Sequence, residues 1–154
     1  MTTVLGVVAG LFFAVIVCDP VVRFIVGQAR AGTPTIPGPE PPFTRMHAPF
    51  VGDKGARWLG GLERALFFVG FFQGSPELVA GWLLFKVASK WESWQNIVRI
   101  PESLEGVDPI EFLRYRHTWG VKVMQSFLVG TLSNILAGIA GAVVTRWIQE
   151  ALCG

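Results

Sequence analysis

A long apolar stretch runs from Val121 to Trp147, and its only charged residues are Lys122 near the start and Arg146 near the end. A helix needs about 20 apolar residues to cross the ~30 Å hydrocarbon core of a bilayer. The composition agrees with a membrane setting, because 16% of the residues are charged against about 25% in an average soluble domain. We therefore predict a membrane-spanning helix at 119–147.

Three further apolar segments predict spans at 4–26, 55–73 and 76–94. The last two flank a turn in which Gly74 suits a helix C-terminus and Pro76 a first helical position, so we expect them to form a helical hairpin. The first segment lacks the basic start of a secretory signal, and we expect it to be retained as a helix. The predicted fold is all-α and polytopic, with four transmembrane spans in a single domain, 1–154.

The segments between the spans differ in character. Residues 28–53 are rich in proline, which removes backbone donors, and predict an extended connector on the cytoplasmic side. A capping-box-like start, Asp108 to Glu111, predicts a helix that runs towards Ile148. Its first part is amphipathic, and we interpret it as a cytoplasmic juxtamembrane helix with a bend at Gly120.

Basic residues set the expected orientation, because cytoplasmic loops carry an excess of Lys and Arg. They gather after the first and third predicted spans, whereas the hairpin tip has none. The members of these two groups are Arg23, Arg30, Arg45, Lys54 and Arg57, then Lys90, Arg99, Arg114 and Arg116. We therefore expect a multi-pass protein of the inner membrane with both termini on the non-cytoplasmic side.

Several classes of function find no support in the sequence. The net charge is only +2 and the basic residues form no stripe, so we expect no nucleic-acid partner. Cys18 and Cys153 stand apart without a histidine or a second cysteine nearby, and we predict no metal site, disulfide or cofactor. The common nucleotide-binding and hydrolase motifs are absent, which makes an enzyme the less expected class.

Charged residues inside the predicted hairpin are the main candidates for a site. Glu63 and Lys86 lie equally far from the turn, which places both about 17 Å from the tip of an antiparallel pair. Charges at such a depth are costly and need a partner or a wet cavity. One interpretation is an ion pair that locks the hairpin, with Arg64, Lys86 and Lys90 extending towards the interface. The other is a proton, ion or lipid-headgroup site.

Asp19 and Arg23 lie four residues apart on one face of the first span. The simpler interpretation is a local ion pair at the membrane boundary. The alternative is that Asp19, beside the helix-disrupting Pro20, leaves backbone carbonyls accessible and joins the group around Glu63 and Lys86.

A second basic cluster precedes the last span. It consists of Arg114, Arg116, His117 and Lys122. One interpretation is a positive anchor on the cytoplasmic side, and the other is a site for an anionic lipid headgroup.

Small residues recur on one face of the first and last spans, where helices can approach closely. The members are Gly6 and Gly10 in the first span and Gly130, Asn134 and Gly141 in the last. We expect Asn134 to make a hydrogen bond across this contact. Two such faces also suggest self-association or association with other membrane subunits, in addition to membrane lipids.

Three functions remain open from the sequence. The first is an accessory or structural subunit of a membrane assembly, and measuring the association state of the protein tests this function. The second is a small ion or proton channel or transporter that uses Glu63, Lys86 and Asp19. The third is a membrane enzyme that acts on a lipid-linked substrate.

Overall fold

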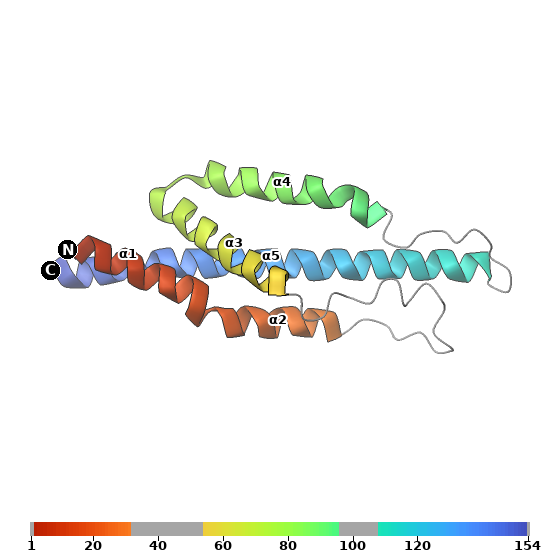
Figure 1. The fold of residues 1–154 in the computed structure, drawn as a ribbon, viewed down its shortest axis with the longest axis horizontal. Helices are drawn as coiled ribbons and strands as arrows, with labels where there is room; N and C mark the ends of the chain where they lie inside the picture. The colour runs from red at the N-terminus through yellow and green to blue at the C-terminus, as the bar shows by residue number, and fades with distance from the viewer. Residues whose placement is uncertain (1, 32–53, 96–107, 154) are drawn as a thin grey trace.

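A computed structural model describes residues 2–31, 54–95 and 108–153, and this part of the chain is helical without strands. The elements are α1 (Thr2–Phe12), a π-helix η1 (Phe13–Val17), α2 (Asp19–Ala31), α3 (Lys54–Gln73), α4 (Pro76–Gln95) and α5 (Pro109–Cys153). Figure 1 shows α5 running along the whole molecule, with α2 and α4 on opposite sides of it. The predicted connector begins too early, since α2 continues to Ala31, and its residues 32–53 lie outside the described part.

The last helix is a single uninterrupted element of 45 residues, which corresponds to about 67 Å of helix. The predicted helix from Asp108 towards Ile148 is therefore found, and its first part continues into the apolar part through Gly120 without interruption. One glycine inside a long helix costs only about 1 kcal/mol, which the flanking helical turns outweigh. The helix is longer than the ~30 Å hydrocarbon core of a bilayer.

The first apolar segment is broken where proline occurs. The Cys18 N–H donates to the Phe13 carbonyl over 3.0 Å, which is the wider π-helical spacing. Pro20 has no backbone N–H, so it supplies no donor to the carbonyls of the preceding turn. The disruption beside Asp19 was expected, whereas the π-helix before it was not. Such π-helical turns are rare and occur frequently at functional sites.

Helices α3 and α4 begin and end within one residue of the predicted limits. Gly74 has a φ of +70°, the left-handed conformation that ends a helix and that glycine adopts without strain. The Ser75 N–H then donates to the Gly70 carbonyl over 2.8 Å. The two helices contact each other as they lead away from this turn.

Close packing joins α1 to α5 through glycine. A Cβ added to Gly10 would meet the Thr145 side chain and approach the Gly141 carbonyl oxygen to 2.5 Å. Gly6 also lies against this helix, where a Cβ would come within 3.3 Å of the Thr145 carbonyl oxygen. The Thr145 hydroxyl donates to the Gly6 carbonyl over 3.1 Å. Gly6, Gly10 and Gly141 thus lie at the contact between α1 and α5. Because they are used within one chain, they no longer argue for self-association.

Two helical regions are long and apolar enough to cross a membrane, Thr3–Ala29 and Gly120–Leu152. Only 17% and 39% of the residues in their most apolar windows are buried, whereas the core helix of a soluble protein is mostly buried. The outward face of α5 exposes large apolar side chains three or four residues apart. These are Leu128, Leu132, Leu136, Ile139, Val143 and Trp147.

Candidate functional site

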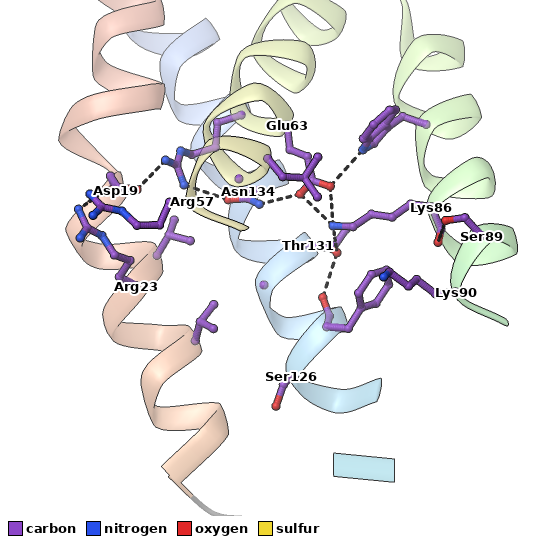
Figure 2. A pocket seen from close by; sticks show the side chains of 18 of the residues that line it. Asp19, Arg23, Arg57, Glu63, Lys86, Ser89, Lys90, Ser126, Thr131 and Asn134 are labelled. Carbon is purple, nitrogen blue, oxygen red and sulfur yellow. Dashed lines mark hydrogen bonds and ion pairs between the residues drawn. The ribbon is translucent and has the colours of Figure 1, made fainter. Parts of the chain in front are cut away.

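Glu63 is the centre of a polar network between the helices, and only 2% of the residue is exposed. Its carboxylate lies 2.6 Å from Nζ of Lys86, which donates a hydrogen bond to it (Figure 2). The indole N–H of Trp82 donates to the same group over 3.3 Å, and the amide of Asn134 donates over 2.9 Å. Three donors from two helices therefore compensate this buried charge.

Lys86 on α4 lies where the number of residues from the turn predicts it. Glu63 and Lys86 are equally far from the turn, and the expected proximity of the two residues is found. Trp82 precedes Lys86 by one helical turn, so both side chains project from the same face of α4. The hydrogen bond from its indole makes Trp82 a member of the network beside Lys86.

Arg64 forms the second half of the network and is 4% exposed. Its guanidinium donates to Oδ1 of Asp19 over 2.7 Å, and to the Val15 carbonyl and Oδ1 of Asn134 over 3.2 Å each. The expectation that Arg64 extends towards the interface was wrong, because these acceptors from other helices hold it in the interior. Its buried Nε has no hydrogen-bond partner among the described residues.

Asn134 joins the two halves. Its amide oxygen accepts from Arg64 and its amide nitrogen donates to Glu63. An amide side chain offers a donor and an acceptor together, which a neighbouring cation and anion both require. The hydrogen bond that we expected from Asn134 is therefore present, and the Asn134 amide links the two buried charges of α3, Glu63 and Arg64.

Asp19 connects the first helical segment to the network. One carboxylate oxygen accepts from Arg64, and the other pairs with Arg23, which is half-exposed. The local pair and the connection to the central group, which were alternatives in the sequence, thus occur together. Arg64 also donates to Val15, in the turn that Pro20 leaves without a donor.

Lys86 has partners on α5 as well as on α3. Its Nζ donates to the Thr131 hydroxyl over 2.7 Å and lies 4.7 Å from the centre of the Phe127 ring. The Thr131 hydroxyl in turn donates to the Phe127 carbonyl. Lys90, one turn further along α4, is exposed and takes no part in the network.

A pocket of about 570 Å³ lies beside the network, between α2, α3, α4 and α5. Among its lining residues five are basic and two are acidic, the acidic ones being Asp19 and Glu63. The basic residues are Arg23, Arg57, Arg64, Lys86 and Lys90. Valine, leucine, phenylalanine and tryptophan side chains form much of the remaining wall.

The second basic cluster lies away from this pocket. Arg114 and His117 are exposed on α5 and Lys122 is half-buried, and none of the three lines the pocket. The side chain of Arg116 lies outside the described part. The structure thus separates the two groups of candidate residues. In the described ranges, no three His, Cys, Asp or Glu residues are grouped to hold a metal ion.

Sequence reasoning did not single out several residues of the site. Thr131 and Phe127 follow the helical spacing of Asn134 and so occupy its face of α5, which is a signal that was available. Arg57 was noted only for its charge in the orientation argument. Comparison with protein-family models, with curated proteins and with solved structures found no match.

Proposed function

We propose that the chain is a multi-pass protein of the inner membrane with four spans, in which α3 and α4 form a transmembrane hairpin. The exposed apolar faces of α1 and α5 support this, since a contiguous apolar surface of that extent needs lipid or a partner to cover it. Figure 1 places both termini and the α3–α4 turn towards the same end of the molecule. The excess of basic residues towards the opposite end favours a non-cytoplasmic position for both termini.

Within the membrane, we propose the role of an accessory or structural subunit of a membrane assembly. The observation that carries this is the saturation of the central charges. Glu63 accepts from three side chains and Asp19 from two, so both acids are engaged in holding helices together. A proton-transfer group, by contrast, needs a free position for the proton that it takes up.

Association with other subunits is the second part of the proposal. The apolar stripe on α5, Leu128 to Trp147 at intervals of three or four residues, is the surface that we assign to self-association or to a neighbouring subunit. Side chains at this spacing can pack against a second helix. Lipid would cover whatever part of the stripe a subunit leaves free.

The topology is tested by labelling single cysteines in a background from which Cys18 and Cys153 have been removed. Gln73→Cys at the turn and Asp108→Cys before α5 form a matched pair, because both residues are exposed. A membrane-impermeant maleimide applied from the non-cytoplasmic side should modify Gln73→Cys alone. Modification of Asp108→Cys without permeabilisation would contradict the proposed orientation.

The subunit role is tested by extracting the protein with its surrounding membrane into native nanodiscs and measuring the mass of the particles. A closed oligomer, or a second polypeptide in fixed stoichiometry, supports the proposal. A uniform monomer with lipid alone contradicts it. Leu132→Ala with Leu136→Ala should weaken the association, and Leu84→Ala with Phe85→Ala on α4 provides an exposed apolar control.

Transport of ions or protons is the second candidate, and one observation favours it. The pocket reaches Glu63, Lys86 and Asp19, the three residues on which that function depends. In proteoliposomes with a pH-sensitive dye, this candidate requires a flux that Glu63→Gln abolishes. Equal and negligible flux with and without the protein would exclude it. The structure adds nothing to the enzyme alternative, which stays a prediction of the sequence.

A further inference from the structure

We propose that the pocket between α2, α3, α4 and α5 binds an anionic phospholipid, with the phosphate between its basic walls and an acyl chain along its apolar wall. The inference rests on the membrane location in the proposed function and adds a ligand to it. The pocket has five basic residues and two acidic ones, and both acids are already neutralised by partners within the network. An unbalanced positive charge is left for a ligand.

The basic side chains come from two opposing walls. Figure 2 shows Arg23 and Arg57 on one side of the pocket and Lys86 and Lys90 on the other. Arg57 and Lys90 are exposed and have no acidic partner in the part of the chain that the structure describes. A phosphate group placed between the walls would accept charge-assisted hydrogen bonds from both, which are the stronger kind.

The depth of these side chains fits a headgroup. Arg57 precedes Glu63 by about 9 Å of helix, and Lys90 follows Lys86 by about 6 Å, in both cases away from the turn. This direction leads out of the membrane interior on the proposed cytoplasmic side. Anionic lipids give that leaflet a negative surface potential, which attracts basic residues near the interface.

The apolar lining selects an amphiphile over a free anion. Val22 and Val26 of α2, Phe85 of α4 and Phe127 of α5 all face the pocket. Its volume of about 570 Å³ lies within the usual range for small-molecule sites, roughly 300–1,000 Å³. A free phosphate would leave these surfaces unused, whereas the first part of an acyl chain would cover them.

One polar atom of the lining is also unused. Nε of Arg64 is buried without a hydrogen-bond partner among the described residues, although both terminal nitrogens of the guanidinium donate hydrogen bonds. A buried donor without an acceptor costs about 1–3 kcal/mol. Arg64, which lines the pocket, therefore retains one unpaired buried donor in addition to the net positive charge of the lining.

The test uses the full chain, stripped of lipid in detergent and examined by native mass spectrometry. Dioleoyl-phosphatidylglycerol, dioleoyl-phosphatidylcholine and glycerol 3-phosphate are titrated separately. We expect one phosphatidylglycerol to bind at least about tenfold more tightly than phosphatidylcholine. Each basic side chain near the headgroup should increase the affinity for the anionic lipid roughly fivefold. Glycerol 3-phosphate should bind far more weakly, because it lacks the acyl chain.

Variants locate the site. Arg57→Gln with Lys90→Gln should weaken phosphatidylglycerol binding about 25-fold, at roughly fivefold for each charge, and should weaken phosphatidylcholine binding much less. The charge-matched control is Arg114→Gln with Lys122→Gln, which alters the basic cluster outside the pocket. Gly130→Leu should weaken binding by occupying the pocket, since a Cβ there points towards Val26 at 3.5 Å. Circular dichroism of each variant checks that the helices are intact.

Three results would overturn the inference. Equal affinities for the two lipids would show that charge does not select the ligand. An affinity for glycerol 3-phosphate equal to that for phosphatidylglycerol would show that the acyl chain does not contribute. A loss confined to the Arg114 and Lys122 variant places the lipid at the other cluster. Retention of the protein in carbonate-washed membranes, measured on the same preparation, tests the membrane location separately. A failure of the lipid-site inference can then be distinguished from a failure of the proposed membrane location.

Discussion

Glu63→Gln, made alone and together with Lys86→Met, tests whether the buried ion pair holds α3 and α4 in place. The single substitution leaves Lys86 with the Thr131 hydroxyl and the Phe127 ring but without its carboxylate. Removing one partner of a buried pair costs about 3–5 kcal/mol. The Lys86 side chain is 14% exposed, so some water reaches it, and we expect the lower end of that range.

The double substitution should cost much less than the sum of the two single ones. With both charges removed, no buried ion is left without a partner, and apolar replacement of a whole pair is often neutral. We expect the double variant to lie within about 1 kcal/mol of the parent. At about 3 kcal/mol for each single substitution and about 1 kcal/mol for the double, the coupling between the two positions should be about 5 kcal/mol, which exceeds the range of about 0.5–3 kcal/mol usual for residues in contact.

The assay is reversible unfolding in mixed micelles, in which the fraction of sodium dodecyl sulfate is raised and helicity and tryptophan fluorescence are recorded. Glu150→Gln and Arg146→Met provide controls, because both residues are exposed and neither lines the pocket. If the free energies of the Glu63 and Lys86 variants add within about 0.5 kcal/mol, the pair does not act as a lock. The structural argument for the network would then fail.

Three further predictions use the same unfolding assay. Gly10→Ala should destabilise the protein by more than about 2 kcal/mol, since the added Cβ would clash with Thr145. The control is Gly27→Ala, whose Cβ meets nothing within 4 Å and which should be neutral or slightly stabilising. Arg64→Lys should cost about 2 kcal/mol or more, because an ammonium group cannot reproduce the planar guanidinium fork; an unchanged stability would show that charge alone suffices. Trp82→Phe keeps the ring but removes the indole donor, and should cost about 1 kcal/mol; a loss above about 3 kcal/mol would point to packing instead.

The parts of the molecule that the sequence predicted are those set by local chemistry. The α3–α4 turn follows from the residue types Gly74 and Pro76, and the meeting of Glu63 with Lys86 follows from counting along two antiparallel helices. Neither step requires knowledge of which other helices lie nearby. The helix limits were accurate here for the same reason.

The remaining features depend on how distant helices are rotated against one another. Arg64 and Glu63 are neighbours in sequence, yet one binds Asp19 and the other binds Lys86. A single chain does not reveal which acid approaches which base across 45 residues of sequence. The course of α5 through Gly120, by contrast, agrees with the predicted helix from Asp108 towards Ile148, since a single glycine does not end a long helix.

The hydrogen bond from Arg64 to Val15 makes the first helical segment depend on a helix that comes later in the chain. Pro20 gives the preceding turn no donor, and in a bilayer each unsatisfied backbone group costs several kcal/mol. Val15 receives its hydrogen bond from a residue 49 positions later in the chain, and Asp19 receives its ion pair from the same residue. Before α3 packs beside it, the first segment therefore has only Arg23 to pair with Asp19, and the Val15 carbonyl lacks the donor that Arg64 provides. In the proposed membrane setting, the first segment therefore depends on α3, and its insertion without α3 would leave a backbone carbonyl without a donor in the bilayer.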